Sequence, residues 1–136
     1  MSLAPRVARE IMRHVRRQRP GMSRAYIDDL KLCLCVRCGR PGPNDPHHLQ
    51  RSVPVGERGT GRRASDQFAI PLCRRCHRWV ESTGDDEAQL ASIGIDGRAL
   101  AAASWRERGR PEAMQRIAVR FHQASLVYCN RMVAVQ

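Results

Sequence analysis

The spacing of apolar residues along the chain predicts a mainly helical protein that also contains short strands. Helical spacing or helix-start residues occur over residues 5–18, 23–31, 73–81, 85–94, 96–105 and 111–132. The last of these is the longest expected helix, with apolar side chains at every third or fourth position: Met114, Ile117, Phe121, Ala124, Tyr128 and Met132. Short strands are expected from His47 and over residues 66–72, where apolar residues alternate with others. We therefore predict a small α+β fold.

Three parts can be distinguished along the 136 residues, a length that fits one domain with appendages. Residues 1–22 form a basic arm ending at a Pro-Gly break, residues 23–110 the central domain, and residues 111–136 a C-terminal amphipathic helix expected to pack on the core. The first helix of the central domain begins at Ser23, with four residues expected to face the core: Ala25, Tyr26, Ile27 and Leu30. Aromatic residues make up only 4% of the chain, and small aliphatic cores often gain stability from a bound metal.

The chain is strongly basic, with a formal net charge of +11, and Lys31 is its single lysine. Because the guanidinium group of arginine binds phosphate in a bidentate way, this composition favours a nucleic-acid partner over a merely solvated basic surface. No apolar run approaches the ~18 residues of a membrane-spanning helix, and the arginine-rich N-terminus is unlike a secretory signal. We therefore expect a cytoplasmic protein.

Two Cys-x-x-Cys pairs, Cys35 with Cys38 and Cys73 with Cys76, supply the four thiolates of a closed tetrahedral zinc site. Gly39 gives the first pair the backbone freedom that a tight turn requires. Cys33 is an alternative to Cys35, but only Cys35 reproduces the spacing of the second pair, so Cys33 is expected to be buried and structural. A redox role for the second pair is weaker, because it leaves the matching first pair without a use.

The segment between the two cysteine pairs contains adjacent histidines, His47 and His48. Adjacent residues of a strand point to opposite sides, so the two histidines are expected to have different roles. His77 and Glu81 are four residues apart on the following helix and share a face. One strand histidine with these two side chains would bind a divalent ion and leave positions open, and the other would accept a proton from water. A structural alternative places His47 or His77 on the zinc in place of a cysteine.

These motifs resemble the HNH endonucleases, also called ββα-metal or His-Me finger nucleases, and in particular the zinc-containing phage proteins of the recombination-enhancement-function type. The resemblance covers about residues 24–106. It rests on Asp45-x-His47-His48, on Asp66, and on Pro71-Leu72-Cys-x-x-Cys-His77. Further similarities are Tyr26-Ile27-x-x-Leu30, Gly94-Ile95-Asp96 and an alanine-rich segment ending in Trp105.

The resemblance implies a zinc-stapled ββα core and metal-dependent hydrolysis of DNA phosphodiester bonds, linked to phage DNA recombination or processing. It implies that His48 is the general base and that His47 and His77, joined by Glu81, bind Mg²⁺ or Mn²⁺. Asp66 takes the middle position of the motif, usually Asn, which fixes the loop and can touch the metal, and it is a candidate catalytic residue together with His48. Glu81 stands where a second helix histidine often occurs.

Two groups of arginines are candidates for contact with DNA phosphates: Arg51, Arg62 and Arg63 in a basic loop, and Arg74, Arg75 and Arg78 on the helix that carries His77. A recombinase or a single-strand-binding protein is a candidate partner. The basic arm and the final helix are candidates for extending the DNA contact or for self-association. The alternative function is a non-catalytic, zinc-dependent nucleic-acid-binding module that retains the HNH scaffold.

Overall fold

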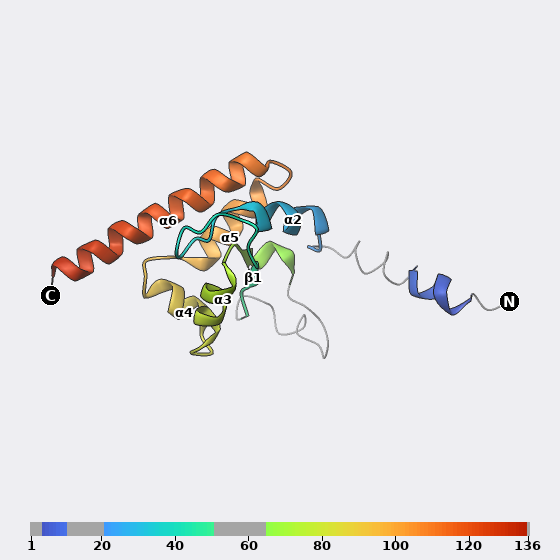
Figure 1. The fold of residues 1–136 in the computed structure, drawn as a ribbon, viewed down its shortest axis with the longest axis horizontal. Coiled ribbons are helices and arrows are strands. Elements are labelled where there is room, and N and C mark those ends of the chain that lie inside the picture. The colour runs from blue at the N-terminus through green and yellow to red at the C-terminus, as the bar shows by residue number, and fades with distance from the viewer. Residues whose placement is uncertain (1–3, 11–20, 51–64, 136) are drawn as a thin grey trace.

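The computed structural model of the protein describes residues 4–10, 21–50 and 65–135. Residues 5–10 are helical, as predicted, and the remainder of that expected helix lies outside the described residues. The elements that follow are α2 (Arg24–Leu32), β1 (His47–His48), the 3₁₀ turn η2 (Asp66–Phe68), β2 (Ala69–Ile70), α3 (Arg74–Glu81), α4 (Asp86–Ala91), α5 (Gly97–Arg106) and α6 (Pro111–Ala134). The described chain is thus mostly helical with a very small sheet, which agrees with the predicted α+β class (Figure 1).

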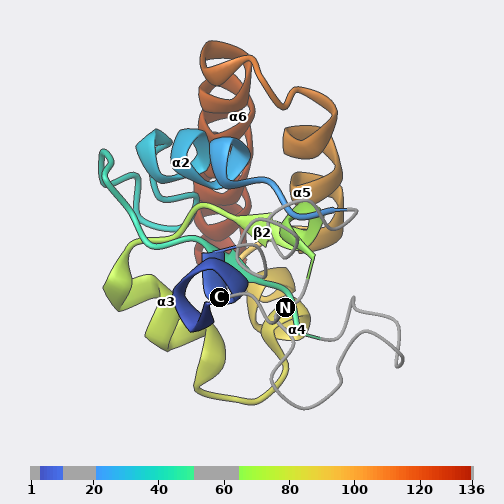
Figure 2. The ribbon, with the colours of Figure 1, turned by 90° about the vertical axis from the view of Figure 1, so that its right-hand side faces the viewer.

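The sheet consists of β1 and β2, which pair antiparallel with His47 opposite Ile70 and His48 opposite Ala69. Figure 2 shows α2, α5 and α6 on one side of this sheet and α3 and α4 on the other. The sheet therefore places His47 and His48 at the centre of the molecule. Its second strand, β2, leads into α3, the helix that carries His77.

The core has two adjoining parts. The larger one surrounds the sheet and combines aliphatic side chains with cysteines: Cys35, Val36, Leu49, Ile70, Leu72, Cys73, Cys76, Val80, Leu90, Ile95, Leu100, Ala101 and Ile117. The smaller one lies where α2 meets α6, and it contains Tyr26, Leu30, Cys33, Ala69, Met114 and Ala118. The ring of Tyr26 packs edge-on against Trp105, with 4.8 Å between ring centroids. Three of the four paired cysteines are buried, so a metal between them would be part of the core.

The helix starts predicted from local sequence are confirmed. The side chains of Ser23, Asp85 and Asp96 accept hydrogen bonds from backbone N–H groups in the first turns of α2, α4 and α5. Each bond satisfies a donor that the helix itself leaves unpaired. None of the helices in the described residues combines the length and the apolar character needed to span a membrane.

Two expectations are wrong, and a third holds only in part. Residues 66–68 form a 3₁₀ turn and only residues 69–70 form a strand, because the buried carboxylate of Asp66 accepts the N–H of Ser23 at 2.7 Å and turns the chain toward α2. Ala25 is exposed rather than core-facing. The helix α6 contacts α2 and α5, as predicted, but Ala124, Tyr128 and Met132 of its apolar stripe are exposed.

Candidate metal sites on one helix

The four cysteines of the two Cys-x-x-Cys pairs come together in a single cluster. Cys35 and Cys38 lie in the turn after α2, and Cys73 and Cys76 lie at the start of α3. Their sulfur atoms are all within 4.8 Å of one another, and Cys38 Sγ is 3.7 Å from Cys73 Sγ. Four sulfurs bound tetrahedrally to zinc at about 2.3 Å would be about 3.8 Å apart, so the cluster fits a structural metal ion of this kind.

Cys33 lies outside this cluster. Its thiol is buried and faces the carbonyl oxygen of Asp29, with 3.6 Å between sulfur and oxygen. Burial, followed by the negative charge of Asp29, raises the pKa of Cys33 to about 11, and burial also raises the pKa of Cys35 to about 12, so the pKa values do not separate the two thiols. Of the two alternatives for the first zinc ligand, the geometry selects Cys35.

The surroundings of the cluster fix its shape and modify its charge. Gly39 has a φ of +77°, and a Cβ atom on it would lie 2.7 Å from Nε2 of His122, so the turn requires glycine. Burial opposes ionisation of Cys73, but hydrogen bonds from the Cys76 backbone N–H and from the neighbouring thiols lower its pKa to about 7. Arg37 reaches Cys76 Sγ at 3.4 Å while its guanidinium lies over the Trp79 ring. This cation offsets the charge of nearby thiolates.

A second group of metal-ligand side chains lies beside the first and contains no cysteine. It joins His47 of β1 with His77 and Glu81 of α3, and its ligand atoms are all within 4.8 Å of one another. Glu81 Oε1 is 3.1 Å from His77 Nε2 and 3.9 Å from His47 Nδ1. Adjacent ligands of an octahedral divalent ion are about 3 Å apart, so the pair of His77 with Glu81 already has this spacing, whereas His47 and Glu81 would have to move closer together to bind one. Because both histidines belong to this group, the structure gives no support to a histidine ligand on the zinc.

In each of His47, His48 and His77, one ring nitrogen lies within hydrogen-bonding distance of an aspartate carboxylate. His47 Nε2 is 2.9 Å from Asp86 Oδ2. His77 Nδ1 is 3.1 Å from Asp45 Oδ2 and 3.2 Å from the Asp45 carbonyl oxygen. A histidine that donates one N–H to a carboxylate has its other nitrogen available as a ligand or base. For His47 and His77, these other nitrogens are the two that face Glu81.

The third pair belongs to His48, whose Nε2 is 2.9 Å from Asp66 Oδ1. The second oxygen of Asp66 accepts the N–H of Ser23, so both oxygens have a partner and the carboxylate is fixed. His47 is buried and His48 is half-buried, and their aspartate partners lie on different elements. The prediction that the adjacent histidines point to different surroundings is therefore confirmed.

Sequence reasoning missed the part played by Asp86, which it assigned only to a helix start. The residue is 39 positions from His47, and no spacing rule links them. Burial opposes ionisation of Asp86, but hydrogen bonds from His47 and from the N–H groups of Gln50 and Glu87 lower its pKa. For Asp45 the signal was present, because it belongs to the motif that contains the histidines.

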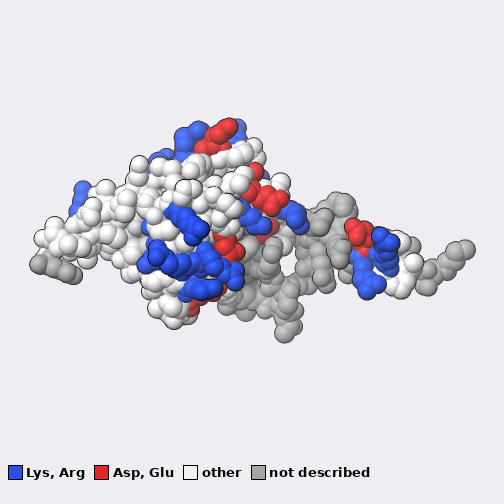
Figure 3. Space-filling view, viewed as in Figure 1, with Lys and Arg blue, Asp and Glu red and all other residues white. Residues whose placement is uncertain are grey.

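The arginines predicted to contact DNA are only partly described. Arg74, Arg75 and Arg78 are exposed on α3, and Arg74 also forms an ion pair with Asp45 at 3.2 Å. Figure 3 shows basic side chains gathered on the face that carries α3. The other predicted contacts, Arg51, Arg62 and Arg63, lie outside the described residues.

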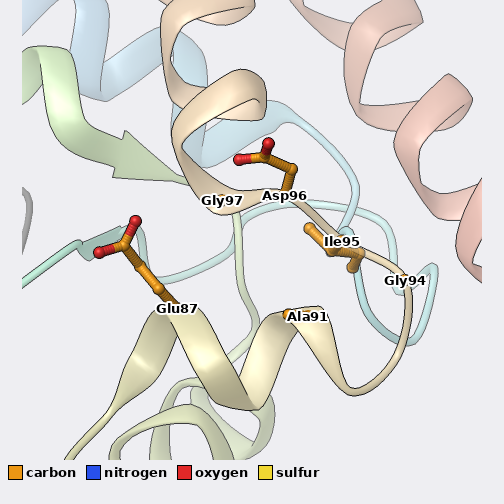
Figure 4. A pocket seen from close by; sticks show the side chains of 6 residues that line it. All are labelled: Glu87, Ala91, Gly94, Ile95, Asp96 and Gly97. Carbon is orange, nitrogen blue, oxygen red and sulfur yellow. The ribbon is translucent and has the colours of Figure 1, made fainter.

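A pocket of about 350 Å³ between α4 and α5 is separate from the histidine cluster (Figure 4). Its lining includes the carboxylates of Glu87 and Asp96. Glu87 forms an ion pair with Arg98 at 2.8 Å, and Asp96 caps α5. Both acidic groups that line the pocket therefore have partners within the fold.

Comparison with known proteins gives a family but no activity. A family model described as "Protein of unknown function (DUF968)" matches residues 2–89. The chain is similar to an uncharacterized protein, YdfU, of Escherichia coli (strain K12), with 38% identity over 61 residues. That alignment covers 45% of this chain and 16% of YdfU. No solved structure matches the chain.

Proposed function

We propose that this chain, which belongs to the DUF968 family, is a metal-dependent DNA endonuclease of the HNH type, linked to phage DNA recombination or processing. The observation that carries the proposal is the arrangement of the three histidines. His47 and His77 converge on Glu81, while the adjacent His48 is held separately by Asp66. A triad of ligands beside a separately oriented base suits one-metal hydrolysis of a phosphodiester, in which the metal stabilises the charge and the base activates water.

His48 is the general base of the proposed reaction. Its Nε2–H donates to Asp66, which leaves Nδ1 to accept a proton from a water molecule. The water oxygen attacks phosphorus as His48 takes its proton, and the bond from phosphorus to the leaving oxygen breaks. That oxygen takes a proton from a solvent water and is released as a hydroxyl, and His48 returns its proton to the solvent. Asp66 stabilises the imidazolium that forms, which is a reason for a carboxylate where related nucleases usually have asparagine.

Two kinds of metal are proposed as cofactors. The cysteine cluster suits Zn²⁺, which holds the turn after α2 against the start of α3. Mg²⁺ or Mn²⁺ at His47, His77 and Glu81 would act as a Lewis acid that stabilises negative charge on the phosphate and on the leaving oxygen. The exposed arginines of α3 bind the flanking phosphates and orient the strand, since they lie on the same helix as His77.

Cleavage of supercoiled plasmid by the zinc-loaded chain, with Mn²⁺ or Mg²⁺ added, tests the proposal. Loss of a general base lowers rates by roughly 10²–10⁴-fold, so we expect a decrease of this size for His48→Ala. His122→Gln is the matched control, because this histidine lies outside the histidine cluster and the glutamine amide can still donate to the Val36 carbonyl; its zinc content is measured as well, since Val36 lies between Cys35 and Cys38. This variant should cleave at the wild-type rate.

Equal cleavage by the wild type and by His48→Ala would contradict the assignment of the base. Salt-dependent binding of DNA without cleavage under either ion would favour the alternative, a nucleic-acid-binding module that keeps the zinc scaffold. Cleavage of single-stranded, duplex and branched DNA, compared in the same assay, would then define the substrate.

A further inference from the structure

Asp86 is a buried carboxylate beside the proposed ligands, with only 3% of its side chain exposed. Its Oδ2 accepts the Nε2–H of His47 at 2.9 Å and the backbone N–H of Gln50 at 2.8 Å. Its Oδ1 accepts the backbone N–H of Glu87 at 2.8 Å. Three donors from three positions in the chain therefore fix both oxygens.

The carboxylate of Asp86 is not the N-cap of α4. The preceding residue, Asp85, is the N-cap, and its side chain accepts the N–H of Ala88 at 3.1 Å. Burial of a charged group is unfavourable unless hydrogen bonds and an opposite charge compensate it. Among the described residues, the side chain that donates a hydrogen bond to Asp86 is His47. Asp86 therefore is not the cap of α4, and the side chain that its carboxylate binds is the imidazole of His47.

The bond to Asp86 decides which nitrogen of His47 is available. Because Nε2–H donates to the carboxylate, the lone pair is on Nδ1, and Nδ1 is the atom 3.9 Å from Glu81 Oε1. The His47 ring is 1% exposed and packs edge-on against the His77 ring, with 4.8 Å between centroids. Both the tautomer and the ring plane of His47 are thus set before a cation arrives.

We propose that Asp86 is a positioning residue of the second metal site, which holds His47 with Nδ1 directed at a divalent cation. The inference rests on the proposed function for the role of that cation in hydrolysis, but not for its binding. His77 and Asp45 form a similar pair, but the Asp45 side chain is 40% exposed, whereas that of Asp86 is 3% exposed. Asp45 should therefore orient its histidine less firmly than Asp86 does.

Isothermal titration of the zinc-loaded full chain with Mn²⁺ tests the inference in Asp86→Asn, a substitution of equal size that removes the charge. Loss of such an outer partner lowers metal affinity by roughly 10–100-fold, and we expect a decrease in this range. Asp85→Ala is the matched control, because it weakens the start of α4 without touching His47. It should bind Mn²⁺ as the wild type does, and both variants should keep the zinc content of the wild type.

Nitrogen-15 NMR of the zinc-loaded wild type, without Mn²⁺, is a second test that needs no variant. It should show His47 protonated at Nε2 and not at Nδ1. An Nδ1–H form, unchanged Mn²⁺ affinity in Asp86→Asn, or an equal decrease in Asp85→Ala would each overturn the inference, as would a wild type that binds no Mn²⁺. If the wild type binds Mn²⁺, Asp86→Asn weakens that binding and yet the wild type cleaves no DNA, only the proposed nuclease function would be contradicted.

Discussion

Replacement of Cys35 and of Cys33 by serine should have opposite outcomes for zinc. The two thiols are two residues apart and both buried, yet only Cys35 belongs to the four-sulfur cluster. Cys35→Ser removes a thiolate that Ser cannot replace, whereas Cys33→Ser leaves all four. The pair is therefore matched in chemistry, burial and location, and it differs only in the proposed contact with zinc.

The size of the effect follows from the energetics of zinc sites. Structural zinc contributes ~10–16 kcal/mol in small zinc domains, or about 2.5–4 kcal/mol for each of four thiolates, which corresponds to roughly 100–1000-fold in zinc affinity. A whole domain is stable by only ~5–15 kcal/mol, so Cys35→Ser should also lower the melting temperature markedly. In Cys33→Ser the hydroxyl can donate to the Asp29 carbonyl as the thiol does, and the cost should be about 1 kcal/mol.

Elemental analysis after dialysis against a weak chelator, together with thermal melting, measures both effects. We expect one zinc per chain for the wild type and for Cys33→Ser, and strong depletion for Cys35→Ser. The reasoning would be refuted if Cys33→Ser lost its zinc, or if Cys35→Ser kept it with a wild-type melting curve.

Two further outcomes are expected. Glu81→Gln should lower the affinity for Mn²⁺ by at least about tenfold, because even the loss of a residue that only orients a ligand has an effect of this size. The melting temperature should not change, since the Glu81 side chain is 49% exposed at the end of α3. Equal Mn²⁺ affinity of variant and wild type in titration would exclude Glu81 as a ligand. Burial raises the pKa of the Tyr26 hydroxyl, so the folded state keeps this proton above pH ~10, where the unfolded chain releases it. The associated stability is complete below that pH and is lost as the pH rises above it. Urea unfolding between pH 9 and 11 should therefore show a steeper loss for the wild type than for Tyr26→Phe, and parallel curves would contradict this.

The parts of the site that sequence could predict are those encoded over short distances. The Cys-x-x-Cys spacing identified four residues that do come together, and the four-residue spacing of His77 and Glu81 placed them on one helix face. The caps of α2, α4 and α5 were also readable, because a cap is a contact between residues three positions apart.

What sequence could not predict depends on packing between distant segments. The contact of Asp86 with His47 depends on how α4 packs against the strand that contains His47, and the local sequence of neither segment predicts it. The alternation over residues 66–72 suggested a longer strand, but Asp66 is bound to Ser23 and His48, so the chain turns instead. In α6 the apolar period runs on after the core ends, because periodicity carries no information about where the neighbouring helices stop.

The two candidate metal sites are not independent, because α3 carries ligands of both: Cys73 and Cys76 for one, His77 and Glu81 for the other. Cys76 and His77 are adjacent in the chain, so release of the first metal would free the end of the helix that aims the second set. A strong chelator would then prevent the proposed cleavage in two ways, by removing the zinc that holds α3 in place and by removing the divalent ion of the second site. After chelation, recovery of the proposed activity should accordingly require zinc first, to hold α3 in place, and Mg²⁺ or Mn²⁺ only afterwards.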